Sequence, residues 1–177
     1  MNFIVTIYRL LVRFGFFLAP FTLLLIRLAW GFELMQSGYG HLTHLDKTTQ
    51  FFESLHIPMA HANAIVSGSV ELVGGLLWMA GLGTRLISIP LVFNFCVAIA
   101  TTNQEGIKAL FGNPSWDPTK VIDDTAFPFL VASLVLLTFG PGVISVDAIL
   151  RKVFFKNLAI QTGAKSVPPT KAEDWMR

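Results

Sequence analysis

Long apolar blocks separated by shorter polar stretches dominate the pattern of this chain. Four of these blocks approach or exceed the length of about 20 residues that a helix needs to cross a membrane. A soluble protein with so much continuous apolar sequence would be hard to keep in water. The pattern therefore predicts an all-α integral membrane protein, a four-helix bundle, with spans at about 14–37, 60–82, 86–102 and 125–143.

Each end of the chain carries a shorter segment in which apolar residues form a stripe and basic residues lie off it. The spacing predicts amphipathic surface helices over residues 1–13 and 145–158, the second with Ser145 as its N-cap. An unstructured basic lead-in is the alternative for the first segment. Residues 161–177, which contain two adjacent prolines, are expected to form a flexible tail.

Composition supports the membrane interpretation and excludes several functions. Hydrophobic residues make up 53% of the 177 residues and charged residues only 14%, against about 25% charged in soluble domains. No basic patch on a soluble face is visible, which argues against a nucleic-acid partner. Cys96 is the single cysteine, so the chain can form neither an internal disulfide nor a Cys-x-x-Cys redox pair.

The distribution of basic residues predicts the orientation. With four spans, both termini and the turn at Arg85 share one side of the membrane, and nine of the lysines and arginines fall there. The other side has only Lys47, Lys108 and Lys120. The positive-inside rule then predicts cytoplasmic termini and outward-facing loops at 38–60 and 103–124.

Arg27 and Glu71 are charged residues in the middle of apolar blocks. Arg27 follows Arg13 by fourteen residues and Glu71 precedes Arg85 by fourteen, so each lies about 21 Å along its helix from the cytoplasmic side. The equal depths predict an Arg27–Glu71 ion pair, with Asn94 within side-chain range of both. The pair either fixes the register of the helices or lines a polar pocket for a ligand head group or a proton path.

Small residues surround Glu71. At helical spacing Gly68, Glu71, Gly75 and Trp78 share one face, and Gly74 lies beside it. Glycines on one face let a second helix approach closely, so Gly68, Gly74 and Gly75 are expected to be packing residues.

The four histidines lie in or at the edge of the first loop. His41 and His44 are three residues apart, a spacing that can place two imidazoles on one helical face. The spacing to His56 and His61 matches no recognised ligand pattern, so no metal site is predicted and the four are interpreted as ordinary interfacial histidines.

Three segments together resemble the DoxX family of small four-helix bacterial membrane proteins, over about Leu24–Asp147. The segments are Leu-Ile-Arg27-Leu-Ala-Trp-Gly31, the stretch Gly68–Arg85 and Gly140-Pro-Gly-Val-Ile-Ser-Val-Asp147. The family often has a lysine soon after a glycine at the end of the first helix. Here Gly38 is followed by Tyr39, Gly40 and His41 instead.

The resemblance implies a bacterial inner-membrane location and two candidate functions. Some relatives are membrane subunits of a thiosulfate:quinone oxidoreductase, and others are associated with oxidative-stress complexes. The first expectation is therefore an oxidoreductase subunit without its own redox centre, which binds a quinone non-covalently at Arg27, Glu71 and Asn94 and works with a protein partner that carries the redox centre. The alternative is a non-catalytic membrane scaffold. Either protein could also form homo-oligomers.

Overall fold

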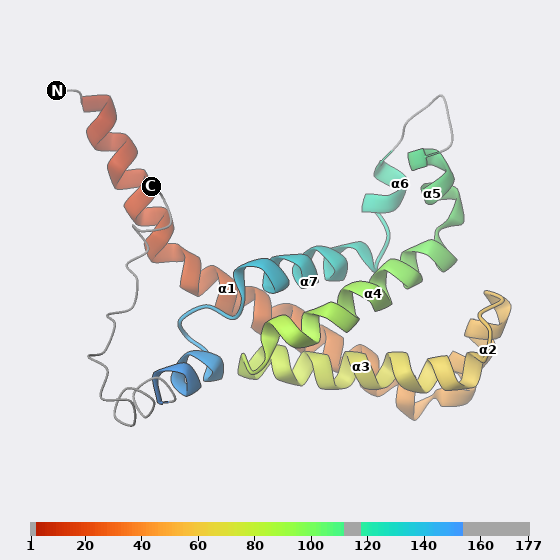
Figure 1. Cartoon of the computed structure of the whole chain (residues 1–177). Helices are drawn as coiled ribbons and strands as arrows, with labels where there is room; N and C mark the ends of the chain where they lie inside the picture. The colour runs from red at the N-terminus through yellow and green to blue at the C-terminus, as the bar shows by residue number, and fades with distance from the viewer. Residues whose placement is uncertain (1–2, 112–117, 154–177) are drawn as a thin grey trace, which may run out of the picture.

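The computed structural model describes residues 3–111 and 118–153, and in these residues every regular element is helical (Figure 1). The helices are α1 (Phe3–Thr43), α2 (Leu45–Ser54), α3 (Ala60–Ala80), α4 (Thr84–Thr102), α5 (Gln104–Phe111), α6 (Thr119–Ile122) and α7 (Phe127–Phe139). A further helix begins at Val146 and is described as far as Val153. The all-α prediction is confirmed.

Three helices, α1, α3 and α4, are long and apolar enough to cross a membrane. The predicted spans at 60–82 and 86–102 correspond closely to α3 and α4. The fourth predicted span, 125–143, was drawn too long, because α7 has 13 residues and ends where Gly140 adopts a φ of 75°. Thirteen residues extend about 20 Å, less than the hydrocarbon thickness of about 30 Å. The four-span topology therefore stays a prediction.

Helix α1 is continuous from Phe3 to Thr43, so the prediction of a separate surface helix over residues 1–13 is wrong. Neither Arg13 nor Gly15 interrupts the helix, because an isolated glycine weakens a helix without ending it. The 41 residues correspond to about 60 Å of helix. Figure 1 shows the N-terminal part projecting away from the other helices and the helix bending before it reaches α3. Pro20 lies inside α1, and an internal proline is a known cause of such bends.

Both predicted loops contain helices. Residues 38–43 are the last turns of α1, and α2 follows almost at once. The second loop contains α5 and α6, and the side chain of Asn103 accepts a hydrogen bond from the Gly106 N–H in the first turn of α5. These short helices have too few residues to stand out as periodic segments. Hydrogen bonds at the helix ends and packing against other helices stabilise them.

Helices α1 and α3 pack as an antiparallel hairpin held together by glycines. A Cβ atom on Gly75 would lie 2.5 Å from the Gly31 carbonyl oxygen, and one on Gly38 would lie 2.6 Å from the Gly68 carbonyl oxygen. The backbones therefore touch without side chains between them. A Cβ atom on Gly68 would lie 3.1 Å from the side chain of Leu42, and Gly74 makes room for the side chain of Leu91 on α4.

Side chains from α1, α3, α4 and α7 form one buried cluster. Trp78 is fully buried, and its indole N–H donates to Ser88 Oγ of α4 at 3.2 Å. The cluster consists of Leu34, Trp78, Leu91, Phe95, Ala132 and Leu136. These four helices therefore share one core.

The α3–α4 turn is bound to the segment that follows α7. Gly81 and Gly83 both have positive φ, as the predicted tight turn requires. The carboxylate of Asp147 accepts the Gly83 N–H at 2.9 Å and the Thr84 N–H at 3.3 Å, and so caps the start of α4. Ser145 accepts the Ala148 N–H at 3.1 Å, which confirms it as an N-cap. The predicted helix over 145–158 is confirmed as far as Val153, and its last residues and the predicted tail 161–177 lie outside the described residues.

Candidate functional site

Arg27 is fully buried, and its guanidinium donates to backbone carbonyls rather than to Glu71. Nε donates to the Trp78 carbonyl at 2.7 Å, and Nη2 donates to the Met79 carbonyl at 3.1 Å. Nη1 donates to the carbonyls of Pro141 at 2.7 Å and Ile144 at 2.8 Å. Arg27 thus joins α1 to the end of α3 and to the turn that follows α7.

The predicted Arg27–Glu71 ion pair is therefore wrong. In the antiparallel register Ser37 lies level with Glu71, whereas Arg27 lies level with Met79. Met79 is eight residues, or about 12 Å, from Glu71 along α3. The error came from measuring depth from Arg13, which belongs to the part of α1 that extends beyond its contact with α3. The negative charge near Arg27 is Asp147, which attracts it electrostatically.

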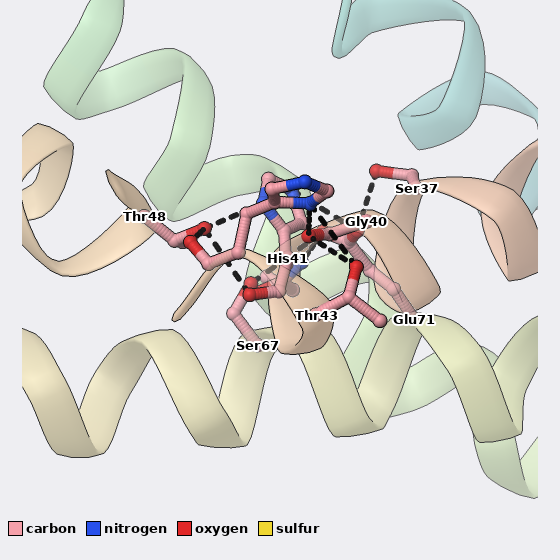
Figure 2. Close-up of polar contacts among 9 residues, drawn as sticks. Ser37, Gly40, His41, Thr43, Thr48, Ser67 and Glu71 are labelled. Atoms are coloured by element: carbon pink, nitrogen blue, oxygen red, sulfur yellow. Dashed lines mark hydrogen bonds and ion pairs between the residues drawn. The ribbon is translucent and has the colours of Figure 1, made fainter. Parts of the chain in front are cut away.

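Glu71 is the centre of a separate polar cluster near the middle of α3, about two helical turns from Arg27 and on the side toward α2 (Figure 2). Its side chain is buried, and Ser37 Oγ donates to Oε2 at 2.8 Å. Asn94 Nδ2 of α4 donates to Oε1 at 3.0 Å, so the prediction that Asn94 reaches Glu71 is confirmed. Ser67 Oγ donates to Asn94 Oδ1 at 2.9 Å, which orients the amide with its NH₂ group toward the acid. Three helices thus contribute to one carboxylate.

His41 completes this cluster. Its Nε2 atom lies 3.6 Å from Glu71 Oε2, within ion-pair range when the imidazole is protonated. Its Nδ1 atom faces Thr48 Oγ1 of α2 at 3.5 Å. Thr48 also donates to the His41 carbonyl at 3.2 Å, so α2 holds the last turn of α1 in place.

The Glu71 cluster is buried on one side and open on the other. The side chain of Glu71 is 7% exposed, but that of His41 is 35% exposed and Ser37 lies at the surface. A molecule at the surface can therefore reach His41 and Ser37, and through them a carboxylate that is itself shielded. An acid that contacts both an imidazole and a hydroxyl can accept, hold and pass a proton.

Sequence reasoning found Glu71 and Asn94 and missed three residues of the cluster. Ser67 precedes Glu71 by one helical turn, which could have been read from the spacing. Ser37 and His41 could not be found in that way, because their contact with Glu71 depends on the α1–α3 register. His41 stands three residues after Gly38, in the region where the DoxX resemblance led us to expect a lysine, and is the side chain there that can carry a positive charge toward Glu71. In the described residues no group of three or more histidine, cysteine, aspartate or glutamate residues could hold a metal ion.

The chain is similar to one protein family and to several named proteins. The model of the DoxX family matches residues 22–104, which include Arg27, Glu71 and Asn94. CatD of Bacillus subtilis, a protein named provisionally as an oxidoreductase, is 28% identical over 130 residues, which cover 73% of this chain and 87% of CatD.

Two further relatives are membrane proteins by name. The uncharacterized membrane protein Rv3486 of Mycobacterium tuberculosis is 29% identical over 136 residues, which cover 75% of this chain and 83% of Rv3486. The inner membrane protein YphA of Escherichia coli is 28% identical over 138 residues, which cover 72% of this chain and 89% of YphA. No solved structure matches the chain.

Proposed function

This chain belongs to the DoxX family of membrane proteins, and from that premise we propose that it is the membrane subunit of a quinone-linked redox complex. The observation that carries the proposal is the shielded Glu71 carboxylate, which lies in contact with the partly exposed His41 and Ser37. A buried acid inside membrane helices is costly and is usually retained for function. The name of the relative CatD supports an oxidoreductase role.

The residues of the Glu71 cluster fit a quinone head group. Such a head group has two carbonyl oxygens that accept hydrogen bonds, and it carries an apolar tail. His41 Nε2 and Ser37 Oγ lie at the open side of the cluster, on helices that are otherwise apolar. The Ser37 hydroxyl donates to Glu71 in the structure and would turn to a quinone oxygen when the head group binds. When bound, the quinone would supply the redox chemistry, with uptake or release of two electrons and two protons. Electrons would be exchanged with a redox centre on a partner protein.

The part of this chain in the reaction is then to bind and to handle protons. Glu71 would hold a proton at Oε2, and His41 would pass it between the carboxylate and the surface. Asn94 would keep Oε1 hydrogen-bonded in both states of the acid, because its amide can donate to a carboxylate or to a carbonyl oxygen. Arg27 has no part in this step and is a structural residue.

We further propose that the protein lies in the bacterial inner membrane with both termini in the cytoplasm. The basic residues that favour this orientation are Arg9, Arg13, Arg85, Arg151, Lys152, Lys156, Lys165, Lys171 and Arg177. The relative YphA is an inner membrane protein by name. In this orientation the Glu71 cluster lies toward the outer side.

The quinone content of the gently purified protein tests the proposal. We expect about one quinone per chain after solvent extraction and mass spectrometry, and loss of most of it in Glu71→Gln. Glu33→Gln is the matched control, because it neutralises an exposed acid on α1 that lies outside the cluster. Quinone retained equally in Glu71→Gln, or absent from the wild-type protein, would contradict the proposal.

A non-catalytic scaffold is the second candidate, and the projecting part of α1 favours it. Figure 1 shows this part of α1 standing clear of the helical core. Its large apolar side chains are exposed, including Phe14, Phe16 and Phe17. If scaffolding is the function, removal of residues 3–17, which include these phenylalanines, will release a copurifying partner, whereas Glu71→Gln will leave both the partner and complementation of a deletion strain unchanged.

A further inference from the structure

Two surface grooves meet at the turn between α3 and α4, which begins about 15 Å along α3 from Glu71. One groove runs between α3 and α4, has a volume of about 510 Å³ and is lined mainly by Leu77, Leu82, Leu86, Ile89 and Pro90. The other has a volume of about 460 Å³ and lies between the turn and the segment that follows α7. Gly83, Leu86 and Asp147 line both grooves, so the two lie side by side at this turn.

The second groove is positively charged. Arg85 and Arg151 line it, and both side chains are exposed. Arg85 Nη2 donates to the Thr138 carbonyl at 3.1 Å, which holds the guanidinium at the edge of the groove. Asp147 is the acid in the lining, and both of its carboxylate oxygens already accept backbone N–H groups at the start of α4. The two arginines are therefore available to an external anion.

The first groove suits an acyl chain. Its lining is almost wholly apolar, and it extends about one turn into α3 and nearly two turns into α4 from the turn that contains Gly83. Leu86 is 75% exposed and Phe139 is 70% exposed, and contiguous exposed apolar surface of this kind is typical of a surface that faces lipid. The arginines lie where these apolar helices end, at the level of the lipid head groups.

We propose that the two grooves together bind an anionic phospholipid of the bilayer. Its phosphate would lie between Arg85 and Arg151, and one acyl chain would lie in the groove between α3 and α4. Charge complementarity favours this ligand, and so does the position of a cationic groove directly beside an apolar one. It does not depend on the quinone proposal, because Glu71 and His41 line neither groove.

The test is lipid binding to the full-length protein in mild detergent, measured by native mass spectrometry. Phosphatidylglycerol and phosphatidylcholine with the same acyl chains are titrated separately. We expect phosphatidylglycerol to bind several-fold more tightly, and each of Arg85→Gln and Arg151→Gln to weaken it about fivefold, in line with the interaction of one basic residue with an anionic membrane surface. The double variant should bind the two lipids equally.

Three controls make the result decisive. Lys47→Gln with Lys108→Gln removes two positive charges near the other end of the molecule and should leave the preference unchanged. Among residues 3–111 and 118–153, Arg151 makes no hydrogen bond through its side chain, so Arg151→Gln tests the site even if Arg85→Gln unfolds. Inorganic phosphate at millimolar concentration should not displace phosphatidylglycerol. Equal affinity of the wild-type protein for both lipids, an equal loss in the lysine control, or displacement by free phosphate would each overturn the proposal.

Discussion

Arg27 and Glu71 are both buried in apolar helices, but their hydrogen bonds are made to different kinds of groups. Arg27 donates only to backbone carbonyls, two of which belong to the last turn of α3. Carbonyls in the last turn of a helix lack partners within the helix, and the helix dipole makes this end negative. Glu71 accepts instead from the side chains of Ser37 and Asn94. The arginine therefore joins separate parts of the backbone. The acid is bound by side chains, which can change their hydrogen bonds while the backbone stays in place.

The first prediction concerns Arg27→Lys. A lysine keeps the charge but cannot reproduce the planar arrangement of four hydrogen bonds. We expect a loss of at least about 2 kcal/mol of stability, because a hydrogen bond to a charged group contributes roughly 1.5–3 kcal/mol. Thermal unfolding in detergent measures this loss. Arg13→Lys, on the exposed part of α1, is the control and should unfold like the wild type.

For single residues, the sequence predicted that Arg27 and Glu71 have polar partners. It identified one of these partners, Asn94. Asn94 was placed near Glu71 from helical rise alone, and the two are hydrogen-bonded. The partners of Arg27 could not be predicted, because backbone carbonyls occur at every residue and leave no mark in the sequence. His41 was interpreted as an ordinary interfacial residue, and only the register of α1 against α3 brings it to the acid.

At the scale of helices, glycines decide how closely α1 and α3 approach. The critical positions are those where a Cβ atom would meet backbone, because backbone cannot move aside as a side chain can. Gly38 and Gly75 are such positions, whereas a Cβ on Gly74 would meet only the side chain of Leu91. The close approach also sets the register on which the Glu71 cluster depends.

The second prediction compares two alanine substitutions on α1. In Gly38→Ala the new Cβ would meet Leu72 N and the Gly68 carbonyl oxygen, so the helices must separate. We expect a loss of about 1–3 kcal/mol, as for other overpacked sites. Gly40→Ala is the matched control two residues away, with no atom within 4 Å of the new Cβ, and it should be neutral or stabilising by up to about 1 kcal/mol. Equal unfolding temperatures for the two variants would contradict this account of the hairpin.

Sequence periodicity located the inner helices better than the ends of the chain. The predicted spans 60–82 and 86–102 differ from α3 and α4 by two residues at most, because Gly81 and Gly83 mark the turn between them. The N-terminal residues were predicted as a separate element because Arg9 and Arg13 interrupt the apolar pattern. Arginine is a good helix former, so the helix continues through these exposed residues. The apolar pattern is therefore interrupted at a place where the backbone stays helical.

At the scale of the whole molecule, α7 decides the topology. It packs with α4 in the common core but is only 13 residues long. If α7 crosses the membrane, the segment that follows it lies beside the α3–α4 turn, on the same side of the membrane as the N-terminus. The hydrogen bonds from Arg27 to Pro141 and Ile144 require that this segment lie level with Arg27. A helix shorter than the hydrocarbon thickness can cross when the bilayer thins locally around it.

The third prediction is that both termini are cytoplasmic. A fluorescent protein fused after Arg177 should fold and fluoresce, whereas alkaline phosphatase fused there should be inactive. Phosphatase inserted after Ile122, before α7, should be active. Active phosphatase at both positions would show that α7 does not cross, and the four-span topology would then be wrong. Active phosphatase at the C-terminus alone would show that the proposed orientation is inverted.

The hydrogen bonds of Arg27 also have a consequence for the order of synthesis. Pro141 and Ile144 follow Arg27 by 114 and 117 residues, so two of its acceptors are made only after α7. At about 5–20 residues per second, a ribosome needs roughly 6–24 seconds to reach them. During that interval the first segment holds a charge in or beside the bilayer without its final acceptors. Nascent chains that stop before Gly140 should therefore stay bound to the insertion machinery, and release should follow once residue 144 has emerged.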